Sequence, residues 1–133
     1  MDTVVVDMHY GSDLMQCPTD IQRGVVRDAV RAGADVVVGQ HAHALLGAGY
    51  RGTAYVSYGL GNFKFYSAGG LSAQTGVLTL TVDGRKVTRP TWTPGTISSG
   101  LPIPLTGSAA AEAVDSWRSL RECAGLSPEP SSR

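Results

Sequence analysis

The three histidines of this chain lie in two short segments, and each segment follows a run of β-branched residues. His9 follows the run at 3–7, and His41 and His43 form a His-x-His pair after the run at 35–39. Neutral imidazole is a good ligand for divalent cations such as Zn²⁺, and a His-x-His pair can bring two imidazoles into one site where the chain bends. Any one histidine alone could be an ordinary hydrogen-bonded loop residue. Because all three occupy such positions, we expect them to share a metal site and to be its catalytic residues.

Two carboxylates flank the first histidine. Asp7 precedes His9 by two positions, and Asp13 follows it by four. Three imidazoles could hold one zinc ion with an open position, but a hydrolytic site also needs a general base, and neither carboxylate is clearly placed for that role. Asp7 lies in a run that otherwise reads as buried, so it either orients an imidazole or has a purely structural role.

Other catalytic chemistries find less support. The chain contains no Gly-x-Ser-x-Gly motif, and Ser57 lies within a predicted strand. Cys17 stands beside Pro18 near a helix start but has no histidine close to it in sequence. The Gly-Leu-Gly at 59–61 is not followed by Gly-Lys-Ser/Thr, which excludes a phosphate-binding P-loop.

A βαβ unit is predicted to position the histidines. The apolar runs at 3–7 and 35–39 are typical of short buried strands. Between them, Pro18 suits a first helical turn, apolar residues recur at helical spacing, and Gly33 suits a left-handed C-cap. Such units are right-handed with parallel strands in nearly all cases, so the carboxyl ends of both strands lie at one edge of the sheet. His9 should therefore meet the His-x-His pair there.

The rest of the chain is mostly β and then α. A third strand is predicted at 53–58, followed by a glycine-rich turn and Asn62, whose amide can point at a nearby group. The remaining expected elements are a loop at 63–71, a hairpin of strands 76–82 and 86–92 around Asp83-Gly84, a surface segment at 94–104, and a final helix capped by Thr106 or Ser108 and ended by Gly125. The predicted class is α/β, with a βαβ unit, antiparallel strands and a C-terminal helix.

Composition sets limits on location and partners. The 133 residues fit one domain, with 42% hydrophobic and 17% charged residues. The net charge is zero and the basic residues are scattered, which argues against nucleic acid as a partner. No apolar run reaches the roughly 18 residues of a membrane span, and the start lacks the features of a signal peptide. We interpret the chain as a piece of something longer.

The two cysteines, Cys17 and Cys123, are too few and too far apart for a zinc knuckle. They form either a disulfide between the loop before the first helix and the last helix, or two inert thiols. The first alternative would imply export.

Three segments together carry a resemblance. They read His-Tyr-Gly at 9–11, Ala-Gly-Ala-Asp-Val-Val-Val-Gly-Gln-His-Ala-His at 32–43, and Ser-Tyr-Gly-Leu-Gly-Asn-Phe at 57–63. Their order and spacing resemble the bacterial capsule-synthesis CapA family, also called poly-γ-glutamate biosynthesis proteins. The resemblance implies the C-terminal part of a calcineurin-like metallophosphoesterase sandwich over 1–126. The composition of 127–133 is typical of a disordered tail.

In such folds, a two-metal centre is built from Asp, His and Asn ligands on N-terminal strands and is completed by a later His and by a Gly-His-x-His pair. The resemblance therefore implies that His9, His41 and His43 bind divalent ions (Mn, Fe or Zn), dinuclear in the complete domain. Asn62 and Tyr10 would lie beside the cavity as substrate-binding residues. Position 10 commonly holds Trp in the family, and the N-terminal ligands have no counterpart in this sequence.

The resemblance implies a role in the biosynthesis or export of a cell-surface polymer, with a metal-dependent hydrolase site of the phosphoesterase type that is incomplete in this chain. An anionic polymer or a phosphoester would be its substrate. Two alternatives are a polymer-binding export accessory without turnover, and a small subunit that completes its site with another chain or in a homo-oligomer. Relatives of this kind usually lie outside the cytoplasm, where Cys17 and Cys123 could pair, so we expect an extracellular or cell-surface location.

Overall fold

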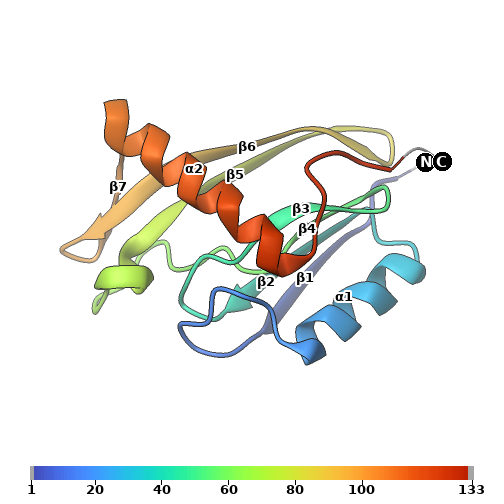
Figure 1. Cartoon of the computed structure of the whole chain (residues 1–133), viewed down its shortest axis with the longest axis horizontal. Coiled ribbons are helices and arrows are strands. Elements are labelled where there is room, and N and C mark those ends of the chain that lie inside the picture. Colours follow the sequence, from blue (N-terminus) through green and yellow to red (C-terminus); the bar gives the residue numbers. More distant parts are fainter. Residues whose placement is uncertain (1, 132–133) are drawn as a thin grey trace.

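The computed structural model describes residues 2–131 and contains two β-sheets and two α-helices (Figure 1). The first sheet has the strand order β1-β2-β4-β3. Strands β1, β2 and β4 run parallel, and β3 is antiparallel to β4. The bounds of these strands are β1 Val5–Tyr10, β2 Val36–His41, β3 Ala48–Arg51 and β4 Ala54–Ser57. The predicted α/β class and the βαβ unit are confirmed.

Helix α1 (Asp20–Arg31) connects β1 to β2. Thr19 caps it in a capping box, because its side chain accepts from the backbone of Gln22 while the Gln22 amide oxygen accepts from the backbone N–H of Thr19. The Thr-x-x-Gln signature places the start of the helix after Pro18. Val26 of α1 is fully buried against Val37 of β2, so the helix covers one face of the sheet.

Strand β1 alternates between two environments. Val6, Met8 and Tyr10 pack against the core under α1, whereas the residues between them point away from it. Val5 is 59% exposed, and β1 forms one edge of the sheet, so its outer backbone groups face no strand among residues 2–131. His9 lies on this exposed face.

The second sheet is antiparallel and covers the opposite side of the first. Its strands are β5 (Gln74–Asp83), β6 (Lys86–Ser98) and β7 (Leu101–Pro104), and a short 3₁₀ helix, η1 (Gly70–Ala73), precedes them. Helix α2 (Gly107–Ala124) lies against β6 and β3 and ends at Gly125 in the left-handed conformation, as expected (Figure 1). Trp92 of β6 and Trp117 of α2 stack in this second core, with ring centroids 5.2 Å apart.

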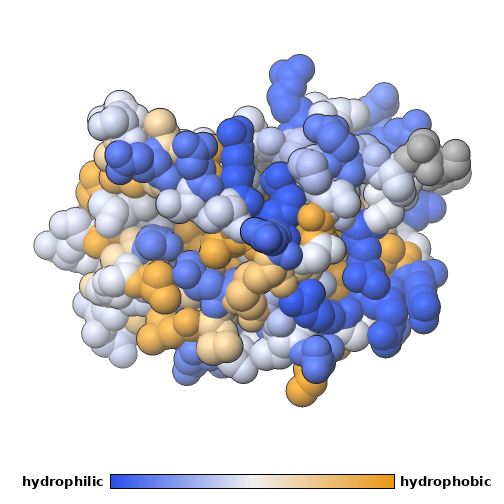
Figure 2. Space-filling model, in the orientation of Figure 1, coloured by the Kyte–Doolittle hydropathy of each residue, from blue (hydrophilic) through white to orange (hydrophobic). Residues whose placement is uncertain are grey.

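The segment at 94–104, expected at the surface, is largely exposed from Ser98 on, but it is regular structure, because β6 continues to Ser98 and β7 follows. Pro102 and Pro104 are tolerated because β7 is a short strand at the edge of the sheet, whereas Pro94 lies in the central strand β6. Pro94 has no N–H to donate, but its carbonyl still accepts from Leu105. On the face shown in Figure 2, apolar patches are small and are interrupted by polar residues.

The tail was expected to be disordered from residue 127, but Ser127 and Ser131 are hydrogen-bonded to β3 and to the turn after it. Ser127 exchanges two backbone hydrogen bonds with Tyr50 of β3, and Ser131 donates to the carbonyl of Gly52. Gly49 permits this approach, because a Cβ atom at that position would lie 2.6 Å from the carbonyl oxygen of Ser127. Residues 132–133 of the expected tail lie outside the described residues. Strand β3 itself was not predicted, since four residues with a glycine show no usable periodicity.

Two long-range links hold these layers together. Asp35, at the start of β2, accepts from Arg85 in the hairpin turn at 2.9 and 3.0 Å and from the backbone N–H of Val4 at 2.9 Å. A disulfide joins Cys17 before α1 to Cys123 near the end of α2, with Cα atoms 5.5 Å apart. No helix among residues 2–131 is long and apolar enough to cross a lipid bilayer.

We expect Asp35→Ala to lower the free energy of unfolding by about 3 kcal/mol, because it leaves the partly buried guanidinium of Arg85 without its carboxylate. The matched control is Asp28→Ala, which removes an exposed ion pair with Arg27 and should cost less than about 0.5 kcal/mol. Urea denaturation followed by circular dichroism measures both. Equal losses in the two variants would contradict the structural role assigned to Asp35.

Replacing both Cys17 and Cys123 by Ser should lower the free energy of unfolding by about 3 kcal/mol, because the disulfide closes a loop between residues 106 positions apart. Reducing agent should shift the urea transition of the unmodified chain by a similar amount and leave that of the double variant in place. Superimposable transitions for the oxidised chain and the double variant would contradict the bridge.

Candidate metal centre

Parallel pairing of β1 with β2 brings the first two histidines together. The register pairs His9 with Gln40 and Tyr10 with His41, so His41 follows the position opposite His9 by one residue. The Nε2 atom of His9 lies 3.0 Å from Nδ1 of His41, and the two rings meet edge to face with centroids 4.9 Å apart. The convergence expected from the βαβ unit is present for His9 and His41.

The chain bends sharply where β2 ends. His41 has φ of 95° and His43 has φ of 54°, although residues with a Cβ atom rarely adopt positive φ. Each such residue costs on the order of 1 kcal/mol or more and persists only where the surroundings hold it. The bend leaves the His41 and His43 rings with centroids 6.0 Å apart, on the same side of the sheet edge. Among residues 2–131, two of the four non-glycine residues with positive φ are the histidines of the His-x-His pair.

Asn62 fixes the ring of His43. Its amide nitrogen donates to the carbonyl of Ser72 at 3.0 Å, so its Oδ1 atom faces Nδ1 of His43, 2.7 Å away, as an acceptor. Nδ1 of His43 must then carry the proton, which leaves a lone pair on Nε2. Thr75 donates its hydroxyl to the backbone carbonyl of Asn62 and holds the turn in place. Asn62 is only 9% exposed, and its side chain is occupied by protein partners.

The two carboxylates near His9 have different surroundings. Asp13 lies on the surface with Oδ1 3.5 Å from Nε2 of His41, so it shares the open side of the site. Asp7 accepts from the side-chain amide of Gln40 at 3.0 and 3.2 Å. Its carboxylate thus ties β1 to β2 and does not orient an imidazole.

Tyr10 lies away from the histidines. Neighbouring strand residues point to opposite faces, so the Tyr10 side chain points into the core and the His9 side chain points to the exposed face. Its ring packs against Gly39, where no other residue type would leave room, and its hydroxyl has no partner among residues 2–131. Burial, reinforced by nearby Tyr58, raises the pKa of Tyr10 well above its usual range. This position differs from the expected one beside the cavity.

Sequence reasoning missed three residues around His43. Phe65 lies with its ring centroid 5.1 Å from that of His43, while Ser72 and Thr75 hold Asn62. Phe65 lies in the expected loop at 63–71, whereas Ser72 and Thr75 lie between that loop and the strand expected at 76–82, where no element was predicted. Nothing in their spacing indicates a role, because their contacts depend on how residues 63–75 fold back over the sheet edge.

The side chains fit part of a metal coordination shell. Two ligands on one ion with metal–nitrogen distances of about 2.0–2.1 Å lie roughly 3 Å apart, which is the separation found between the facing nitrogens of His9 and His41. His43 shows the pattern of a metal ligand, because one ring nitrogen is hydrogen-bonded to a fixed acceptor and the other is free to bind. Among residues 2–131, no group of three His, Cys, Asp or Glu side chains is arranged to hold an ion alone.

Comparison with known proteins covers the region that contains this site. Residues 1–67 match the family described as bacterial capsule synthesis protein PGA_cap. The chain is 45% identical over 65 residues to the PGA biosynthesis protein CapA of Bacillus subtilis (strain 168), and 38% identical over 64 residues to the capsule biosynthesis protein CapA of Bacillus anthracis. Each alignment covers 48% of this chain, but only 17% and 16% of the respective relative.

The family match covers β1 to β4 with all three histidines and Asn62, and it ends before β5. The family resemblance is therefore confirmed over residues 1–67. It was expected to extend to Leu126, and the family match does not cover that remaining part. Because residues 1–67 are half of the 133, the chain belongs to the bacterial capsule synthesis protein PGA_cap family.

Proposed function

We propose that this chain supplies part of a divalent-metal centre to a hydrolase of the phosphoesterase type that acts in the synthesis or export of a cell-surface polymer. The observation that carries the proposal is the pair of imidazole nitrogens of His9 and His41, which face each other at 3.0 Å. The PGA and capsule biosynthesis names of the two Bacillus relatives support the biological setting.

The residues of this chain would bind and orient the ion. His9 and His41 would bind through the facing nitrogens, and His43 would bind through Nε2 because Asn62 holds its Nδ1 proton. Asp13, on the open side of His41, would accept a hydrogen bond from a water or a substrate hydroxyl. The chemistry that such an ion supplies is polarisation of a phosphoryl oxygen and activation of water for attack.

The other ligands would come from polypeptide that packs along β1. This strand offers an open edge, and its first residue Val5 and the preceding Val4 are 59% and 46% exposed. An open strand edge with apolar neighbours is a template for pairing with a further strand. That strand would belong to a longer form of this protein or to another chain, and the proposal requires only that it carry ligands toward His9.

The disulfide supports a location outside the cytoplasm. Bridges such as Cys17–Cys123 persist in oxidising compartments and are rare where glutathione keeps thiols reduced. We propose an extracellular or cell-surface location, in agreement with a role in polymer synthesis or export.

We expect the purified chain to bind Zn²⁺ or Mn²⁺, and Asn62→Ala to weaken binding about tenfold or more, because the His43 ring loses its fixed acceptor. His41→Ala should weaken it further, since that change removes a ligand. Isothermal titration calorimetry measures the affinities. Gln40→Ala is the control, since Gln40 lies on the same strand but contacts Asp7 instead of an imidazole. Affinities that are unchanged in both His41→Ala and Asn62→Ala would contradict the metal centre.

Turnover separates the hydrolase from an accessory that binds polymer without reaction. The chain, extended by the N-terminal segment of a relative, should hydrolyse bis(p-nitrophenyl) phosphate in the presence of Mn²⁺, and His41→Ala should abolish this activity. Metal binding without turnover, together with binding of poly-γ-glutamate by the unextended chain, would support the accessory instead.

A further inference from the structure

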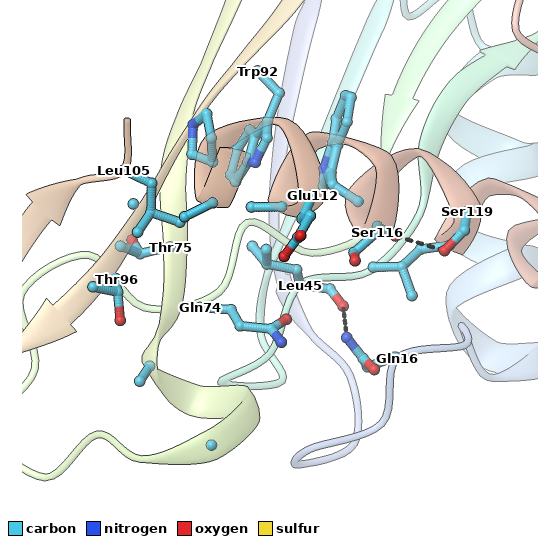
Figure 3. Close-up of a pocket in the computed structure, with 18 residues that line it drawn as sticks. Gln16, Leu45, Gln74, Thr75, Trp92, Thr96, Leu105, Glu112, Ser116 and Ser119 are labelled. Atoms are coloured by element: carbon cyan, nitrogen blue, oxygen red, sulfur yellow. Dashed lines mark hydrogen bonds between the residues drawn. The ribbon is translucent and has the colours of Figure 1, made fainter. Parts of the chain in front are cut away.

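A cleft of about 620 Å³ lies between α2 and the second sheet, apart from the histidines (Figure 3). Leu45, Thr75 and Trp92 contribute to its wall, and α2 faces them with Glu112, Ser116 and Ser119. Figure 3 shows Glu112 extending from α2 toward Leu45, with Gln74 and Gln16 beyond it. The volume is in the range of roughly 300–1,000 Å³ that is usual for small-ligand sites.

The charge of the cleft argues against an anionic ligand. Glu112 is the single charged side chain among the described residues that line it, and neither Lys nor Arg is among them. A polyanion entering this space would meet a carboxylate and no counter-charge, which costs free energy. A neutral ligand avoids that cost, and its hydroxyl groups can donate to the carboxylate oxygens.

The polar side chains offer both donors and acceptors. The side chains of Gln74 and Glu112 have no hydrogen-bond partner within residues 2–131. Gln16 donates its amide to the carbonyl of Leu45 at 3.4 Å, so its amide oxygen remains able to accept. Hydroxyls from Ser116 and Thr96 add groups that can donate or accept. A ligand that matches these walls must carry both functions at closely spaced positions, as the hydroxyls of a sugar do.

Apolar surface alternates with these polar groups. Leu105 and Leu120 line the cleft together with Pro94 and the tryptophan pair. The C–H faces of a pyranose ring can pack against such surface while its hydroxyls reach the amides and Glu112. Such an apolar lining with a few placed polar groups is usual for small-ligand sites.

The cleft is rigidly built. The rings of Trp92 and Trp117 are stacked with an interplanar angle of 6°, which fixes α2 against β6. Gln16 is held at the opposite wall because the next residue, Cys17, is bridged to Cys123 of α2. Walls that are already in place lower the entropy cost of binding a ligand.

We propose that this cleft binds a neutral saccharide segment through Glu112, Gln74 and Gln16. The wall formed by Ala73 to Thr75 directly follows Ser72, whose carbonyl holds Asn62. One wall of the cleft thus adjoins the segment that holds Asn62. The binding site itself does not depend on the metal centre and stands if that centre fails.

The two tryptophans of the chain both line the cleft, so indole signals report directly on its occupation. We expect neutral trisaccharides, chitotriose and maltotriose, to change tryptophan fluorescence and the indole N–H resonances in a saturable manner. A γ-linked triglutamate of similar length should leave both signals unchanged. His41→Ala should bind the trisaccharides as the unmodified chain does, which separates this site from the metal centre.

Glu112→Gln should weaken trisaccharide binding about tenfold, because hydrogen bonds to a charged acceptor are lost. Glu122→Gln is the matched control, since Glu122 lies on the same helix outside the cleft, and its affinity should not change. Gln74→Ala provides a second variant at an exposed position. The proposal is overturned if neither trisaccharide perturbs the indole signals, if the two Glu→Gln variants bind equally well, or if the triglutamate binds at the indoles as tightly as the sugars.

Discussion

The parallel pairing of β1 with β2 is the constraint on which the rest of the structure depends. It requires a crossover, which α1 provides, and it sends the carboxyl ends of both strands to the same edge of the sheet. His9 and His41 meet there without any direct link in sequence. Helix α1 packs against one face of this sheet, the second sheet packs against the other face at β2 and β4, and residues 63–75 fold over that edge.

Two tethers keep the second sheet and α2 in place over this unit. The Asp35–Arg85 pair connects the start of β2 to the hairpin turn, and the Cys17–Cys123 bridge connects the approach to α1 with the end of α2. Between these tethers, the stacked tryptophans fill the second core. The contacts that hold α2 against β6 and the loop before α1 also hold the two walls of the cleft in place.

The histidine site and the cleft share one short segment. Ser72 and Thr75 hold Asn62, which orients His43, and Thr75 also lines the cleft. A ligand that spans both would meet imidazoles at one end and amides, hydroxyls and a carboxylate at the other. The histidine site offers imidazole nitrogens beside an open strand edge, whereas the cleft would bind a neutral ligand between walls that are already in place.

The local pattern of the sequence determined the βαβ unit, the hairpin around Asp83-Gly84 and the end of α2 at Gly125, because each depends on periodicity or on turn residues close in the chain. It also predicted the meeting of His9 with His41, since parallel strands dictate it. The left-handed backbone at His41 and His43, and the core position of Tyr10, depend on packing.

Tertiary structure alone decided the partners of Asn62, the strand β7 and the pairing of Ser127 with Tyr50. These contacts join residues far apart in sequence or use proline and glycine, whose local preferences favour loops. The physical reason is the same in each case, because a distant segment supplies the hydrogen-bond partner. The chemistry of the imidazoles was thus readable from residue type and order, whereas their orientation was decided by the fold around them.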